Sequence, residues 1–143
     1  MSFDLSLKKG DISIATDGTL EIVSDNSKIR QDIVKILLTG VGENRFHKNY
    51  GSYVGLLKIG HHADSQLVEL DLKSSVVKAV KKIMSLQRSQ MRRQFVSPGE
   101  LIIDILDVQA ARDTTDPRLY NIYISVLTQE LTEVRDMITV RIA

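Results

Sequence analysis

The sequence predicts an α+β domain. Two main helical regions pack on a small mixed or antiparallel sheet of C-terminal strands, and a β-hairpin precedes them. Three observations support this: polar and apolar residues alternate near both ends of the chain, apolar residues recur at helical spacing in the middle, and the helices are not interleaved with single strands. We expect the 143 residues to form one domain, with residues 1–23 as a strand or hairpin element and residues 24–143 as the body.

The N-terminal element is a predicted β-hairpin. Residues 11–16 and 19–23 alternate in polarity on either side of Asp17-Gly18. This dipeptide tolerates the positive φ angles of a two-residue hairpin turn. Phe3, Leu5 and Leu7 precede the hairpin, and we expect them to form a short strand or arm.

An amphipathic helix is predicted next. Its apolar stripe consists of Ile29, Ile33, Ile36 and Leu37. Asn26 or Ser27 would cap its start, and Gly40 suits its C-terminal end. Five glycines between residues 40 and 60 then predict an irregular stretch over residues 40–62. Long loops in compact domains tend to be functional or interaction elements.

A second, longer helix is predicted from about residue 64 to residue 94. Its apolar positions are Leu70, Val77, Met84 and Met91, which recur every seven residues, widened by Val76, Val80 and Ile83. Ser97-Pro98-Gly99 ends the pattern.

Three strands are predicted in the last third of the chain. Residues 101–106 form one apolar run, and residues 113–117 form a polar turn. Two later segments alternate, with Ile122, Ile124 and Val126 on one face of the first and Val134, Ile138, Val140 and Ile142 on one face of the second.

Composition argues against several classes of function. The net charge of +1 gives no global field for nucleic acid or a membrane surface, and no apolar run is long enough to cross a bilayer. The absence of cysteine excludes disulfides and thiolate chemistry, and it suits assembly in a reducing cytoplasm. We expect no cofactor and no metal, because adjacent His61 and His62 chelate one ion poorly. A basic stretch over residues 73–93 fits a solvated helix face or an electrostatic protein contact better than a nucleic-acid site.

Residues 24–52 resemble a known family. They contain Gln31-Asp32-Ile33, Leu37-Leu38-Thr39, Gly42-Glu43-Asn44-Arg45 and Tyr50-Gly51-Ser52. This order is similar to that of the baseplate-wedge family of contractile phage tails, often labelled "lysozyme-like", whose members include sheath initiators of phages, tailocins and type VI secretion systems. A Glu-Pro-Arg triplet that many members use to contact neighbouring wedge subunits is absent from this chain.

The resemblance implies a structural protein of the tail baseplate, made in the host bacterial cytoplasm, and not an enzyme. Its implied partners are wedge scaffold proteins, the tail sheath protein and hub or tube proteins, with six copies or a multiple per particle. The terminal strands of the family imply strand sharing with the first sheath ring. The interface candidates are Glu43, Arg45, Phe46, Tyr50, Arg135, Met137, Thr139 and Arg141. The alternative is a peptidoglycan-cleaving tail lysozyme that uses Glu43 as its acid.

Overall fold

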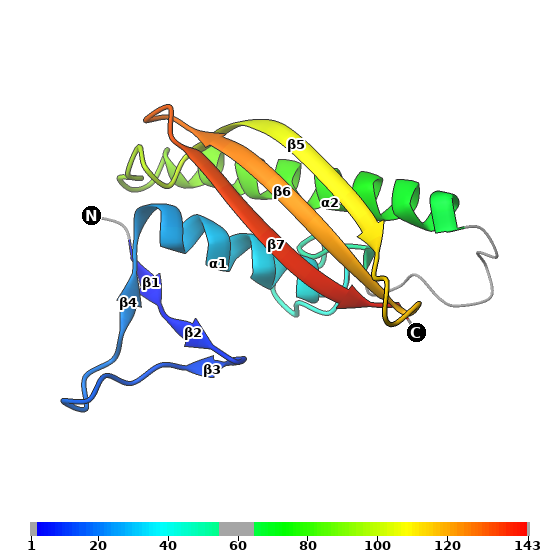
Figure 1. The fold of residues 1–143 in the computed structure, drawn as a ribbon. Helices are drawn as coiled ribbons and strands as arrows, with labels where there is room; N and C mark the ends of the chain where they lie inside the picture. Colours follow the sequence, from blue (N-terminus) through cyan, green and yellow to red (C-terminus); the bar gives the residue numbers. More distant parts are fainter. Residues whose placement is uncertain (1–2, 55–64, 143) are drawn as a thin grey trace.

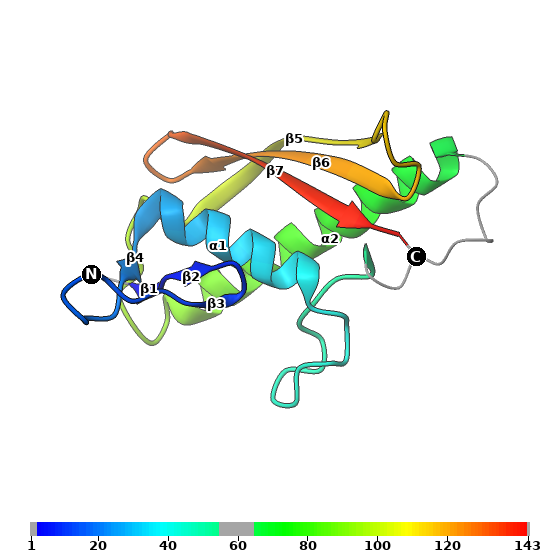
Figure 2. The same ribbon diagram turned by 60° about the horizontal axis from the view of Figure 1, so that its bottom comes forward.

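The structure is a computed structural model that describes residues 3–54 and 65–142. It has two layers, a three-stranded antiparallel sheet and a pair of helices (Figures 1 and 2). A small arm built from the first strands extends from the start of the first helix (Figure 1). The predicted α+β class is confirmed.

The elements follow the predicted order. They are β1 (Asp4–Leu5), β2 (Leu7–Lys8), β3 (Asp11–Ile12), β4 (Ile22–Val23), α1 (Asp25–Leu38), α2 (Ser65–Gln90), β5 (Ile102–Arg112), β6 (Leu119–Thr128) and β7 (Glu133–Arg141). Within the described residues, neither helix is both long enough and apolar enough to cross a bilayer.

The C-terminal strands pair in the order β5-β6-β7, so β6 is central and β5 and β7 are the edges. Because strand side chains alternate between faces, one face of the sheet packs on the helices and the other faces solvent. The buried face carries the predicted apolar set, with Ile122, Ile124 and Val126 from β6 and Val134, Ile138, Val140 and Ile142 near or on β7. These residues share one core cluster with the apolar stripe of α1.

Helix α1 buries the four residues predicted for it, but its cap was wrongly predicted. The helix begins at Asp25, with Ser24 in extended conformation as the N-cap residue. Asp25 has a φ of +48°, and its carboxylate accepts a hydrogen bond of 2.7 Å from the Ser97 hydroxyl. A contact 72 residues away in sequence therefore helps to set the start of this helix, and no local pattern contains it.

The apolar face of α2 agrees with the prediction at Val76, Val80 and Ile83 and differs along the seven-residue row. The buried residues are Val68, Leu72, Val76, Ala79, Val80 and Ile83, whereas Leu70 and Met91 are exposed. Val77 and Met84 are only partly buried against the core. At about 100° per residue, Leu70 lies roughly 160° around the helix from Leu72, on the side away from the core. Each seven-residue step shifts the row by about 20°, so Val77 and Met84 come nearer to the margin of the buried face. Met91 follows the last helical residue, Gln90.

The N-terminal arm is more elaborate than one hairpin. β1 pairs with β4 and β2 pairs with β3, so the first strands complete two small ribbons. A turn forms at the predicted place, but its loop has three residues and not two. The Gly18 N–H donates to the Ala15 carbonyl at 2.9 Å and the Ala15 N–H donates to the Thr19 carbonyl at 2.8 Å. Of the Asp17-Gly18 pair, Gly18 alone has a positive φ. However, the two predicted hairpin strands meet at a single bridge between Ile14 and Leu20. The short arm of Leu5 and Leu7 supplies their remaining partners.

Candidate protein-binding edge

The free edge of β7 has backbone hydrogen-bonding groups that do not pair with another strand of the described residues. In the described part of the chain, β7 pairs with β6 alone. Just past its end, the Ile142 N–H donates to the Arg118 carbonyl at 2.9 Å. Because backbone groups alternate in direction along an antiparallel strand, the even-numbered residues of β7 bond to β6 and the odd-numbered ones face outward. Four predicted residues therefore present their N–H and C=O groups at this edge: Arg135, Met137, Thr139 and Arg141.

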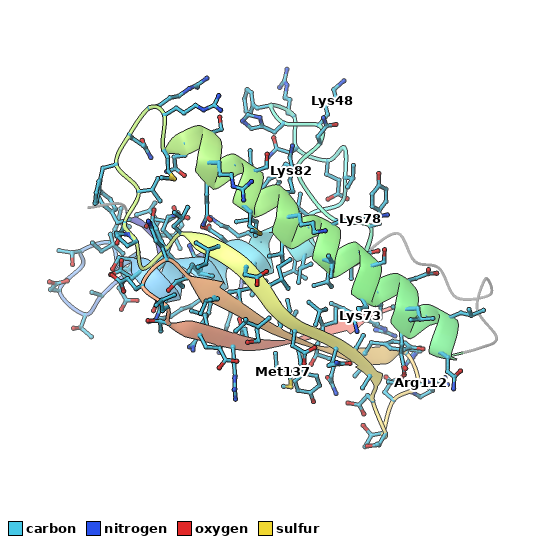
Figure 3. All side chains as sticks on the ribbon, turned by 90° about the horizontal axis from the view of Figure 1, so that it is seen from above. Lys48, Lys73, Lys78, Lys82, Arg112 and Met137 are labelled. Atoms are coloured by element: carbon cyan, nitrogen blue, oxygen red, sulfur yellow. The ribbon has the colours of Figure 1, made fainter. Side chains whose placement is uncertain are left out.

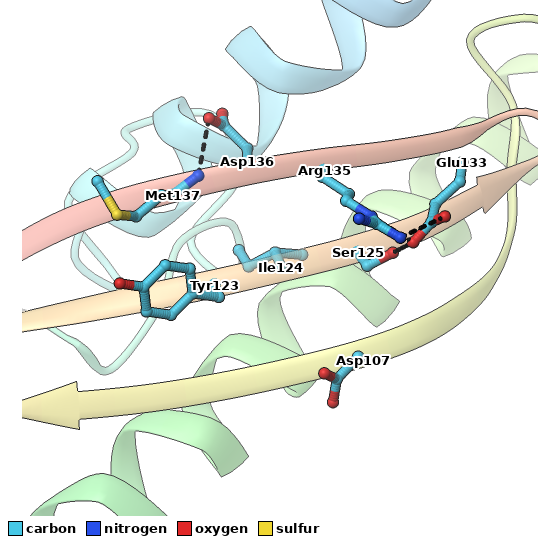
Figure 4. A pocket seen from close by; sticks show the side chains of 8 residues that line it. All are labelled: Asp107, Tyr123, Ile124, Ser125, Glu133, Arg135, Asp136 and Met137. Carbon is cyan, nitrogen blue, oxygen red and sulfur yellow. Dashed lines mark hydrogen bonds and ion pairs between the residues drawn. The ribbon is translucent and has the colours of Figure 1, made fainter.

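The same four residues place their side chains on the exposed face of the sheet. Met137 is 53% exposed and lies opposite Tyr123 of β6, which is also exposed. Figure 4 shows this pair together with the Arg135–Glu133 ion pair, which lies nearer the start of β7. On the other side, the Thr139 hydroxyl donates to the Asn121 side chain at 2.8 Å. The face therefore has a small apolar centre between two polar groups.

The polar group near the start of β7 is tightly connected. The Arg135 guanidinium donates to both oxygens of Glu133, at 2.7 and 3.0 Å, and the Ser125 hydroxyl donates to the same carboxylate at 2.6 Å. These bonds hold the pKa of Glu133 below its usual value and raise that of Arg135. Both side chains are therefore ionised at neutral pH, and they form an exposed ion pair on this face.

Asp136 modifies the free edge, and sequence reasoning missed this role. Its carboxylate accepts the outward N–H of Met137 at 2.9 Å (Figure 4). A strand that pairs along β7 has to displace this carboxylate, and charges at sheet edges are a known device against uncontrolled pairing. The sequence signal was available, because Asp136 is the one polar residue among the even positions from 134 to 142.

The second group of predicted residues lies in the loop after α1. Glu43 is exposed and its carboxylate accepts the Gly40 N–H at 2.8 Å. Arg45 is exposed, and Phe46 is 89% exposed. Tyr50 is partly buried against the core, and this burial raises the pKa of its hydroxyl. Of this loop set, Tyr50 lines the same groove as Asp136 of β7.

The order of residues in this loop has a structural cause. The Ser52 hydroxyl donates to the Leu37 carbonyl at 2.8 Å, and the Ser52 N–H donates to the Thr39 carbonyl at 2.8 Å. Gly51 has a φ of +127°, and a Cβ at this position would lie 2.7 Å from the Thr39 oxygen. Only glycine fits there. The aromatic-Gly-Ser motif and Glu43 therefore close the loop onto the end of α1.

The basic residues divide between two sides of α2, and one side places Lys81, Arg88 and Arg92 around one groove. Lys73 and Lys81 line a groove with Asp104 and Asp107 of β5. Lys82 lines a different groove with Lys48 and the loop residues around it, and Figure 3 shows the lysines distributed along α2. This spread is typical of a solvated helix face.

The described residues contain no group of three or more His, Asp or Glu side chains that could hold a metal ion. His47 is exposed in the loop, and His61 and His62 lie outside the described residues. Glu43 is used as a backbone acceptor, which is a structural role for the one carboxylate that the lysozyme alternative names.

Comparison with known proteins adds one finding. No family model matches the sequence, and no curated protein matches it. The fold is similar to the crystal structure of a "putative tail lysozyme" from Geobacter sulfurreducens, with a TM-score of 0.64 and 15% sequence identity over 87% of this chain and 97% of that one. The chain therefore has a fold found in a tail-related protein. At this identity the likeness establishes the fold alone.

Proposed function

We propose that this chain is a structural subunit of a contractile-tail baseplate, which joins wedge subunits and starts the sheath by pairing the β7 edge with a strand of the first sheath ring. The motif in residues 24–52 and the fold similarity to a "putative tail lysozyme" support a tail-related protein. The free edge of β7 is the observation that supports strand sharing. Its place would be the tail of a particle, with wedge, sheath and hub or tube proteins as partners and six copies or a multiple.

Main-chain pairing suits this edge for a physical reason. A strand added to β7 would gain hydrogen bonds from the outward groups of Arg135, Met137 and Thr139, and the exposed side chains of these residues would set its register. β7 pairs with β6 over nine consecutive positions without a register shift. A regular strand of this length offers a partner an uninterrupted template.

The test removes one outward N–H while keeping the fold. Deletion of residues 133–143 is unsuitable, because it would also remove Val134, Ile138, Val140 and Ile142 from the core. Met137→Pro instead removes a donor that β6 does not use, and proline is tolerated at such edge positions. Met137→Val is the matched control, because it changes the same side chain and keeps the N–H.

The readout is the fraction of purified baseplates that carry sheath after reconstitution with the cognate sheath protein, counted by electron microscopy. An unpaired acceptor on the partner costs about 1–3 kcal/mol, and the proline also removes the Asp136–Met137 hydrogen bond of about 1 kcal/mol that pairing would displace. Met137→Pro should therefore reduce initiation severalfold. Arg135→Pro, whose N–H also faces outward, should do the same. Normal initiation by both folded proline variants would refute strand sharing.

We also propose that the chain has no peptidoglycan-cleaving activity. The support is the structural use of Glu43, whose carboxylate closes the turn at Gly40. Glu43→Gln keeps an oxygen that accepts this N–H but cannot act as an acid. A turbidity assay on peptidoglycan should show no clearing by the natural chain or by Glu43→Gln. Clearing that disappears in Glu43→Gln alone would establish the enzyme instead.

A further inference from the structure

The N-terminal arm and α1 form the walls of an open groove of about 1110 Å³. Ser27, Arg30, Val34 and Leu38 line it on the α1 side, and Leu7 to Gly10 line it on the arm side. At 1.5 Å per residue, the helix from Ser27 to Leu38 gives it a length of about 16 Å. This length matches about five residues of extended chain. Figure 2 shows β2 and β3 running in the direction of α1, and Figure 1 shows them set apart from it.

Polar contacts hold the arm beside α1 and leave the groove between them open. The Gln31 side chain donates to the Leu5 carbonyl at 2.7 Å and accepts the Leu7 N–H at 2.8 Å. Lys35 of α1 forms an ion pair with Asp4 of β1. These contacts fix one wall relative to the other, so the groove is built into the fold.

The groove exposes several large apolar side chains to solvent. Leu38 is 66% exposed and Leu7 is 39% exposed, and Val34 and Tyr50 lie beside them. The arm adds further exposed apolar residues outside the groove: Phe3, Ile12, Ile14, Leu20 and Ile22. Concentrated apolar surface of this kind marks protein-interaction sites.

The charge of the groove selects a kind of partner. Lys8 is neutralised by Glu21, and Lys35 by Asp4 and Asp32. In contrast, Lys9 and Arg30 form no ion pair with the described residues, and the single acid of the lining, Asp136, is at the β7 end. Two unpaired cations therefore border an apolar floor.

We propose that this groove binds a short extended segment of a partner protein that presents apolar side chains to Leu7 and Leu38 and carboxylates to Lys9 and Arg30. The apolar floor favours a peptide over nucleic acid, which would need phosphate contacts along its whole length. Asp136 borders the groove at its β7 end, but the residues proposed to bind the peptide are on the arm and α1, so the inference does not depend on sheath initiation.

The experiment titrates the full, isotope-labelled chain with a ten-residue peptide of alternating leucine and glutamate and follows the amide shifts by NMR. The expected shifts centre on Leu7, Lys9, Arg30 and Leu38. The combined variant Lys9→Glu and Arg30→Glu should weaken binding roughly tenfold or more, because two attractions become repulsions. A matched control, Lys78→Glu with Arg88→Glu on α2, changes the net charge equally and should leave binding unchanged.

Three further results decide the matter. Leu38→Ser should also weaken binding, since it removes the apolar floor without touching a charge. Equal binding of a leucine–lysine peptide would overturn the charge selection. Amide shifts confined to β7 would mean that the peptide does not bind in the groove, and this would refute the proposal. Displacement of the peptide by oligothymidylate, with the shifts at Lys9 and Arg30 retained, would assign the groove to nucleic acid and would also refute it.

Discussion

Substitution of Asp136 tests how the β7 edge is controlled. The Asp136 carboxylate accepts the outward Met137 N–H at 2.9 Å and must leave when another strand pairs there. An exposed, charge-assisted hydrogen bond contributes a net of about 1 kcal/mol. Asp136→Ala should therefore strengthen pairing at this edge roughly fivefold. Asp136→Asn keeps an oxygen acceptor and should change it less.

Two measurements check this expectation. Sedimentation velocity of the isolated chain over a range of concentrations should show more self-association for Asp136→Ala than for the natural chain. Hydrogen exchange at the Met137 amide should be roughly fivefold faster in the monomeric variant, because the N–H has lost its acceptor. Unchanged association and exchange would refute the reasoning. If Asp136→Asn behaves like Asp136→Ala, charge repulsion and not the hydrogen bond controls the edge.

Three more outcomes are expected. Gln87→Leu leaves the buried Ile102 N–H and the Glu100 carbonyl without their hydrogen-bond partner. It should lower the free energy of unfolding by about 2–4 kcal/mol in urea titrations. The control variant Arg88→Leu should change this free energy by no more than about 0.5 kcal/mol. Phe46→Ala should leave the thermal midpoint unchanged, because Phe46 is 89% exposed, yet reduce assembly if the loop docks on a wedge subunit. Burial alone would raise the pKa of Asp4, but the Lys35 hydrogen bond and charge hold it below its ordinary 3.8. The stabilisation from this contact is therefore present above pH 3.8 and lost as the pH falls through the lower folded-state value, which exchange at the Leu7 amide should reveal.

The features that sequence predicted well are those with a short period. Alternation over residues 134–142 determines which side chains of β7 face the core, because a strand reverses face at each residue. The α1 stripe is similarly local. For α2, the exposed Leu70 and the buried Leu72 both fit an apolar pattern, and only the position of the neighbouring sheet decides which face is covered.

The candidate site was predictable only in part, for a related reason. The alternation placed Arg135, Met137, Thr139 and Arg141 on the solvent side. It could not show which edge of β7 lacks a strand, since this follows from the central position of β6. The groove beside α1 depends on where Gln31 holds the arm. Gln31 bonds to Leu7, which is 24 positions away in the sequence, and to Leu5, which is 26 positions away. Neither feature leaves a pattern in the local sequence.

The other edge of the sheet provides an internal comparison for strand sharing. In β5, the Ile105 N–H is bonded to the Asp104 carboxylate at 2.8 Å, just as the Met137 N–H is bonded to Asp136. However, the pairing of β5 with β6 is interrupted at two places, between Ile102 and Asp104 and between Ile105 and Asp107. Such irregularities bend a strand and break the row of outward groups that a partner needs.

Removal of the carboxylate should therefore have different effects at the two edges. Asp136→Ala should increase association because β7, the strand that carries this residue, has a regular register and can pair without interruption. Asp104→Ala should not, because the irregular register of β5 still prevents continuous pairing. Sedimentation of the two variants at equal concentration makes the comparison. Equal association of both would mean that the carboxylates, and not strand regularity, determine which edge accepts a partner.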